Sequence, residues 1–140
     1  MPTAIPRKAT VNEMATRATF TDHKDTFQAA LISLFSGKSE DTEKDLSRLL
    51  TPDFTLRADD ATFDFAGFVA HMRWLRENVP RVTLTIVQFL RDGSQLADRH
   101  IGETTLDDGT VMKSETFMFI EVAKDGRLSS IVETVRPVKS

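Results

Sequence analysis

The chain has 140 residues, of which 40% are hydrophobic and 28% charged, and its formal net charge at pH 7 is -3. This length suffices for one domain with a hydrophobic core, and the charge balance excludes the basic footprint of a nucleic-acid-binding protein. The absence of cysteine excludes disulfides, thiolate nucleophiles and cysteine-based zinc sites, and the absence of tyrosine excludes phenolic acids or bases.

No apolar run is long enough to span a bilayer, and the N-terminal region lacks the apolar core of a signal peptide. We therefore expect a cytoplasmic protein that does not interact with a membrane. The three histidines are too scattered to form a recognisable metal motif, and we predict no metal or other cofactor. Residues 1–20 are predicted to be a flexible N-terminal arm, and residues 21–140 a single domain.

Three helices are predicted in the N-terminal half of the domain. The first has Thr21 or Asp22 as its cap and apolar residues at helical spacing over residues 27–35. The second is short and covers residues 42–50, before a proline. The third covers residues 65–78 and carries an apolar stripe along one side.

A short hairpin is predicted between the second and third helices, and from residue 81 onward the chain shows only strand signal. Residues 81–90 alternate, residues 96–121 form a long hairpin, and residues 127–138 form a last strand. Glycine-containing turns favour antiparallel neighbours. This order predicts an α+β fold in which a curved antiparallel sheet of about six strands wraps around the three helices, forming a cone with an apolar cavity.

The long hairpin mixes titratable and aromatic side chains, and its turn is predicted at Asp107-Asp108-Gly109. Strict alternation divides its side chains between two faces of the sheet. We interpret one face as an inner wall of the cavity, with a partly wet surface as the alternative. The predicted inner wall carries Asp98, His100, Glu115 and Phe117.

The element order, with the stretches LLTPDFTL, HMRWLRENVP and KDGRLSSIVE, resembles the NTF2-like superfamily, and most closely its SnoaL-like and ketosteroid-isomerase-like members. The resemblance covers roughly residues 21–137. It implies a cystatin-like cone. Many members are isomerases, dehydratases or polyketide cyclases acting on small hydrophobic carbonyl compounds, whereas others have no known activity, so the fold does not fix the function.

The resemblance to ketosteroid isomerases concerns one acidic residue. Those enzymes place a carboxylic acid two residues before an aromatic pair on the penultimate strand, and Glu115 precedes Phe117 and Phe119 in the same way. The resemblance therefore implies that Glu115 is a neutral acid that donates a hydrogen bond to a substrate carbonyl, as in ketosteroid isomerase, the standard example of this arrangement. The catalytic base and the tyrosine of that family fall near Ala58 and Ala30 and are not matched.

The resemblance to SnoaL-like cyclases points by position to Asp98 and His100. Together with Glu115 these residues form a workable set for proton transfer. His100 can remove a proton α to a carbonyl, Asp98 can orient the imidazole ring, and a protonated Glu115 can support the enolate. The alternatives are a structural polar cluster and a strand face open to water.

Further side chains are predicted to line the cavity. Glu133 lies between apolar neighbours on the last strand, where it is either a pocket carboxyl with a raised pKa or an edge residue paired with Arg99 or Lys113; we favour the pocket. His71 borders the apolar stripe of the third helix and is either a boundary residue or part of the lining. The predicted lining comprises His71, Phe117, Phe119, Ile131, Glu133, Phe27, Leu31 and Met72.

Two hypotheses for the function follow. The first is a small cofactor-independent isomerase, cyclase or dehydratase that acts by acid/base chemistry on an apolar carbonyl or polyketide-like molecule. The second is a non-catalytic small-molecule-binding or dimeric interaction domain of the same fold. From the resemblance we also expect a homodimer formed through the outer sheet face, with Thr83, Thr85, Ser114, Thr116 and Met118 as contributors.

Overall fold

The computed structural model describes residues 17–139, so residues 1–16 of the predicted arm lie outside the described residues. The helices are α2 (Lys24–Phe35), α3 (Thr42–Leu49) and α4 (Phe65–Asn78), with single 3-10 turns η1 (Phe20–Asp22) and η2 (Ser39–Asp41). The strands are β1 (Leu50–Ala58), β2 (Ala61–Asp64), β3 (Arg81–Asp92), β4 (Gln95–Thr105), β5 (Val111–Val122) and β6 (Leu128–Pro137).

Helix α4 has its predicted bounds because Asp64 caps it: the Asp64 Oδ1 atom accepts a hydrogen bond of 2.8 Å from the Gly67 backbone N–H. The predicted cap of α2 was wrong. Thr21 and Asp22 belong to η1, and the Thr21 hydroxyl oxygen accepts a hydrogen bond of 2.9 Å from Arg91. None of the helices among residues 17–139 is long and apolar enough to cross a membrane.

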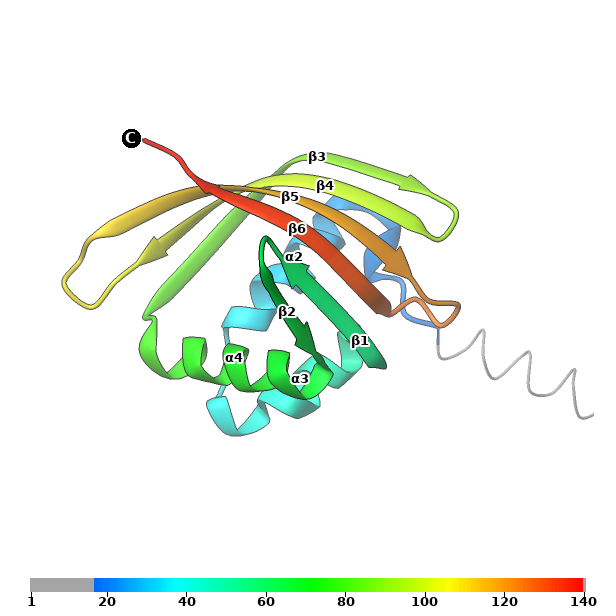
Figure 1. Cartoon of the computed structure of the whole chain (residues 1–140), viewed down its shortest axis with the longest axis horizontal. Helices are drawn as coiled ribbons and strands as arrows, with labels where there is room; N and C mark the ends of the chain where they lie inside the picture. The colour runs from blue at the N-terminus through cyan, green and yellow to red at the C-terminus, as the bar shows by residue number, and fades with distance from the viewer. Residues whose placement is uncertain (1–16, 140) are drawn as a thin grey trace, which may run out of the picture.

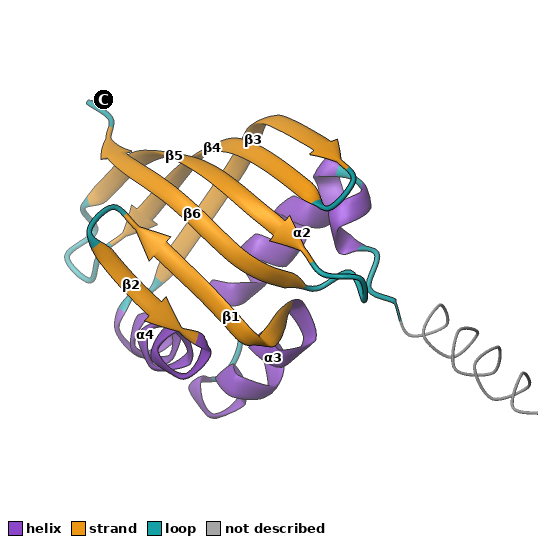
Figure 2. Cartoon of the chain, turned by 45° about the vertical axis from the view of Figure 1, so that its right-hand side comes forward, coloured by secondary structure: helices purple, strands orange, loops and turns teal. Residues whose placement is uncertain are grey.

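The six strands form one curved sheet in the order β2-β1-β6-β5-β4-β3. The sheet arches over α2, α3 and α4, which cover its concave side (Figures 1 and 2). This arrangement confirms the predicted α+β fold. It differs from a fully antiparallel sheet in one place, because β1 and β6 pair in parallel. The long connection from β1 to β6 runs through α4 and the four strands β2, β3, β4 and β5, so no tight hairpin forces this pair to be antiparallel.

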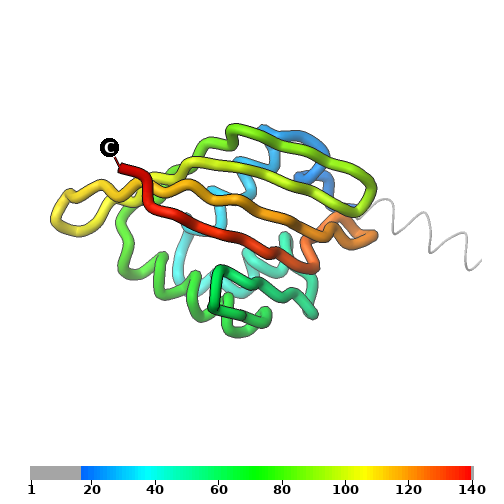
Figure 3. The backbone as a smooth tube through the Cα atoms, turned by 45° about the horizontal axis from the view of Figure 1, so that its top comes forward, coloured from blue at the N-terminus to red at the C-terminus, as the bar shows by residue number. Residues whose placement is uncertain are grey.

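The β4–β5 hairpin determines which side chains enter the concave side. Opposite residues include Asp98 with Met118, His100 with Thr116, and Gly102 with Ser114. The hairpin is long, and its turn extends beyond the rest of the sheet (Figure 3). Because side chains alternate along a strand, even-numbered residues of β4 and β5 share the concave face and odd-numbered residues share the convex face.

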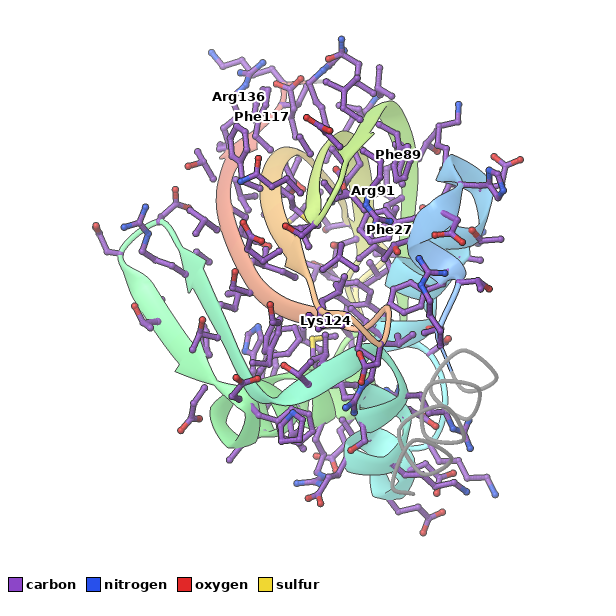
Figure 4. All side chains as sticks on the ribbon, turned by 90° about the vertical axis from the view of Figure 1, so that its right-hand side faces the viewer. Phe27, Phe89, Arg91, Phe117, Lys124 and Arg136 are labelled. Carbon is purple, nitrogen blue, oxygen red and sulfur yellow. The ribbon has the colours of Figure 1, made fainter. Side chains whose placement is uncertain are left out.

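The hydrophobic core lies between the helices and the concave face. Phe27 of α2 is fully buried, and its ring centroid lies 5.8 Å from that of Phe89 on β3 (Figure 4). Phe54 of β1 is also fully buried and packs against Phe68 of α4, with 5.5 Å between the ring centroids. These contacts hold the helices against the sheet and shape the space between them.

The turn between β5 and β6 anchors the segment before α2, and this contact can be tested at Gly126. The Ala18 backbone N–H donates a hydrogen bond of 2.7 Å to the Asp125 carbonyl oxygen. Gly126 has a φ of +88°, and a Cβ atom added there would collide with the Ala18 backbone. We predict that Gly126→Ala lowers the free energy of unfolding by about 2 kcal/mol or more, through backbone strain and the collision.

Gly109 provides the control, because its φ is +86° and an added Cβ atom would meet nothing within 4 Å. Gly109→Ala should carry the conformational cost alone, so it should be clearly less destabilised than Gly126→Ala in urea unfolding. Equal losses in the two variants would mean that the contact with Ala18 contributes nothing.

Candidate functional site

A cavity of about 260 Å³ lies between the concave face of the sheet and helices α2 and α4. Its helix side is apolar and includes Leu31, Leu34 and Met72. Its sheet side carries the polar groups, among them His100 and Glu133. A concave, mostly apolar pocket with a few convergent polar groups is the usual form of a small-molecule site.

His100 and Asp98 form a hydrogen-bonded pair on β4. The His100 Nδ1 atom lies 2.8 Å from Asp98 Oδ1, and both side chains are buried. When the Asp98 carboxylate accepts this hydrogen bond, Nδ1 carries the proton and the Nε2 lone pair is left for another partner. His100 is part of the cavity lining, whereas Asp98 lies behind it. The pair has the geometry of a general base with an orienting carboxylate.

The Oδ2 atom of Asp98 has no hydrogen-bond partner among the protein atoms of the described residues. Among residues 17–139, Asp98 Oδ2 is the buried side-chain polar atom without a hydrogen bond. Most buried polar atoms in folded proteins are hydrogen-bonded, and leaving one unpaired costs roughly 1–3 kcal/mol. A bound water, a ligand or a catalytic role would each account for such an atom.

Glu133 on β6 adds a third titratable group to the same wall. It is half-buried, and the loss of solvation raises the pKa of its carboxyl to about 7. A smaller, opposing effect comes from His100, and Asp98 and Asp59 raise the pKa further. The register explains the proximity, because Met118 pairs with Asp98 on one side and with Glu133 on the other. Near neutral pH, Glu133 can therefore hold a proton and donate it.

The prediction that Glu115 lies on the inner wall was wrong. Glu115 pairs with Ile101 on β4, which places it on the convex face. There its carboxylate oxygens lie 2.7 Å from Arg99 Nη1 and 2.7 Å from Arg136 Nε. The hydrogen bonds from Arg99 and Arg136 lower the pKa of Glu115. An ionised, doubly paired carboxylate outside the cavity cannot serve as the neutral acid that the resemblance implied.

Three aromatic residues of the predicted lining also lie elsewhere. Phe117 and Phe119 share the convex face with Glu115 and are exposed, and Figure 4 shows Phe117 beside Arg136 and apart from Phe27. Phe27 is buried in the core against Phe89 and is not part of the cavity lining. The structure places the other predicted residues at the cavity, namely Leu31, His71, Met72, Ile131 and Glu133.

Several lining residues escaped the sequence prediction. Phe63 of β2 stacks on His71, with ring centroids 5.3 Å apart, and both belong to the lining. Thr116, Ser114 and Gly102 line the sheet side. Of the residues expected at a dimer interface, Ser114, Thr116 and Met118 face the cavity instead. Thr83 and Thr85 lie on the convex face, where Thr83 is half-buried and Thr85 is exposed. The even-numbered alternation of β5 was the signal that could have found these positions.

No group of three or more His, Asp or Glu side chains in the described part of the chain is arranged to hold a metal ion. The candidate site therefore consists of the His100–Asp98 pair and Glu133 around an apolar pocket.

The raised pKa of Glu133 predicts a pH-dependent gain in stability for Glu133→Gln. The carboxyl has a folded-state pKa of about 7 against an ordinary 4.5, so the wild-type protein loses stability as the pH rises between these values. The variant lacks this loss. Its free energy of unfolding relative to wild type should rise by on the order of 1–3 kcal/mol between about pH 5 and about pH 8.

Urea unfolding at both pH values measures this difference, with Glu103→Gln on the exposed side of β4 as the control. The control should differ from wild type by the same amount at both pH values. A pH-independent difference for Glu133→Gln would contradict a proton held by Glu133.

No protein-family model matches the sequence. Among known proteins, an uncharacterized protein of Schizosaccharomyces pombe is 28% identical over 109 residues, which cover 78% of this chain and 82% of that protein.

Solved structures give a clearer comparison. A provisionally assigned SnoaL-like polyketide cyclase of Jannaschia sp. superposes with a TM-score of 0.60 at 13% identity, covering 76% of this chain and 83% of that one. A provisionally assigned isomerase of the SnoaL-like family from Agrobacterium tumefaciens has a TM-score of 0.61 at 12% identity, covering 81% and 97%. An NTF2-like protein of unknown function from Exiguobacterium sp. has a TM-score of 0.61 at 12% identity, covering 80% and 98%. The chain therefore has the NTF2-like fold that SnoaL-like proteins share.

Proposed function

We propose that the protein is a small acid/base enzyme that acts without a cofactor on an apolar carbonyl compound, as an isomerase, cyclase or dehydratase. The observation that carries this proposal is the buried His100–Asp98 pair, whose Nδ1–Oδ1 distance is 2.8 Å, at the wall of an apolar cavity. The cyclase and isomerase descriptions of proteins with the same fold support this reaction class.

In the proposed reaction His100 Nε2 removes a proton from the carbon α to the substrate carbonyl. Asp98 stays ionised and stabilises the imidazolium that forms. Glu133 replaces Glu115 as the acid: its neutral carboxyl donates a proton to the carbonyl oxygen, so that an enol forms without a build-up of negative charge. In each outcome the Glu133 carboxylate takes back the enol O–H proton as the carbonyl re-forms. His100 gives its proton to another carbon in isomerisation, to the oxygen of a second carbonyl attacked by the enol carbon in cyclisation, and to a β-hydroxyl that leaves as water in dehydration.

The proposal predicts a His100-dependent exchange of α-protons in a ketone probe. In D₂O the protein should catalyse deuterium incorporation next to the carbonyl of 2-tetralone, a small bicyclic ketone, as followed by NMR. We expect His100→Ala, Asp98→Asn and Glu133→Gln each to lower the rate by on the order of 10²-fold, because general acid/base groups contribute about that much.

The controls are His23→Ala and Glu115→Gln, since His23 is exposed and Glu115 lies on the convex face. Both should keep the wild-type rate. Exchange at the buffer rate in the wild-type protein, or an unchanged rate in His100→Ala, would favour the alternative of a non-catalytic binding domain.

We also propose that the convex face mediates homodimer formation. Leu90, Ala97, Phe119 and Val132 lie opposite one another across four neighbouring strands, β3 to β6. Leu90 and Phe119 are 71% and 68% exposed. A contiguous apolar row on a protein surface marks an interaction site, and a twofold-symmetric dimer would cover the same row on both copies.

Phe119→Asp should therefore convert a dimer into a monomer, because it would place two unpaired carboxylates in the apolar interface. Sedimentation equilibrium measures the mass, which for one chain is 15.7 kDa. The control is Val111→Asp, which changes an exposed apolar residue at the far end of β5. A wild-type monomer, or a dimer that survives Phe119→Asp, would contradict this interface.

A further inference from the structure

Gly102 leaves an open space in the cavity wall beside His100. It is the next residue of β4 on the concave face, between Leu84 on β3 and Ser114 on β5. The backbone does not require glycine here, because Gly102 is not among the residues with positive φ. Glycine inside a strand weakens the strand and marks a bulge, a bend or the close approach of a ligand or another backbone. The register is regular at Gly102, so it is not a bulge, and its missing side chain leaves room at the cavity wall for a ligand.

Polar atoms of the neighbouring strands lie beside this space. A Cβ atom added to Gly102 would lie 3.5 Å from Ser114 Oγ and 3.7 Å from the Thr83 carbonyl oxygen, which is ordinary contact. Thr104 and Ser114 are half-buried and line the cavity with their side chains, whereas Thr83 contributes its backbone carbonyl, because its side chain shares the convex face with Glu103. The helix side of the cavity, on α2 and α4, is lined by leucine, methionine and phenylalanine together with His71. The pocket thus has a mainly apolar helix side and a hydroxyl-bearing region around Gly102 on its sheet side.

The charges of the lining restrict which ligand groups can bind in the hydroxyl-bearing region around Gly102. Among the described residues that line the cavity there is no Lys or Arg, and Glu133 lies on the neighbouring wall. A carboxylate or phosphate group there would lose its hydration without gaining a cationic partner, which is costly. A neutral hydroxyl or keto group can exchange hydrogen bonds with Thr and Ser at no such cost.

We propose that Gly102, the hydroxyls of Ser114 and Thr104, and the Thr83 carbonyl oxygen form a subsite for a neutral oxygen substituent of the ligand. The two same-face positions His100 and Gly102 are separated by roughly 7 Å along the strand, so the substituent sits about one bicyclic ring system away from the reacting carbon. The position of the reacting carbon rests on the proposed function. Binding of the oxygen substituent at the subsite does not depend on catalysis.

Ligand-observed NMR titrations with two ketone probes test the subsite. We expect the wild-type protein to bind 6-hydroxy-2-tetralone about 3- to 10-fold more tightly than 2-tetralone, which is the range of one net hydrogen bond. Ser114→Ala should lose most of this preference because it removes a hydroxyl. Gly102→Val should fill the space and abolish the preference. Thr85→Ala, which removes an exposed hydroxyl on the same sheet, is the control and should keep the preference.

A charged ketone tests whether the lining disfavours anions. 6-Carboxy-2-tetralone should bind more weakly than 2-tetralone, and tighter binding would overturn the neutral ligand class. Equal affinity of the wild-type protein for 2-tetralone and its 6-hydroxy derivative, or a preference that survives both Ser114→Ala and Gly102→Val, would overturn the subsite. These outcomes are independent of catalysis: a preference without His100-dependent exchange would contradict only the proposed function, and exchange without a preference would contradict only the subsite.

Discussion

The pairing register of the β4–β5 hairpin is the constraint on which the site depends. Its loop contains Asp107, Asp108 and Gly109, and Leu106 pairs with Thr110 through a backbone hydrogen bond of 2.8 Å. A three-residue loop of this kind places even-numbered residues opposite even-numbered residues. A slip of one position in β4 would turn every side chain of that strand to the other face, so that His100 and Asp98 would leave the cavity and Arg99 would enter it.

Two glutamates show how this register determines chemistry. Glu133 and Glu115 have the same side chain but opposite pKa shifts. On the concave face, the loss of solvation raises the pKa of Glu133 to about 7. On the convex face, hydrogen bonds from two arginines lower the pKa of Glu115. The first is available as an acid near neutral pH and the second is a fixed anion. Neither role follows from residue type, and both follow from the strand face on which the residue lies.

Much of the fold could be predicted from the sequence because its local signals agree. The apolar stripe and the Asp64 cap define α4, and the position of the turn near Asp108 defines the long hairpin. The face of Glu115 could not be predicted from the family analogy, which uses spacing along one strand and ignores the partner strand. Lys113 and Glu121, which share its parity, were the local evidence for an outward face. The parallel β1–β6 pair and the burial of Phe27 depend on long-range packing, for which no short stretch carries a signal.

The same alternation separates the proposed acid/base groups from the proposed dimer surface along a single strand. Arg99 lies between Asp98 and His100 in the sequence, yet it forms the convex-face network with Glu115 while its neighbours form the cavity pair. Substitutions on the convex face can therefore alter the proposed dimer surface without changing the cavity side chains, provided that the register holds. The Arg99–Glu115–Arg136 network spans β4, β5 and β6 and ties together the three strands that carry His100, Thr116 and Glu133. Its contribution to the site is positional, because it supports the strand pairing that aligns the cavity wall.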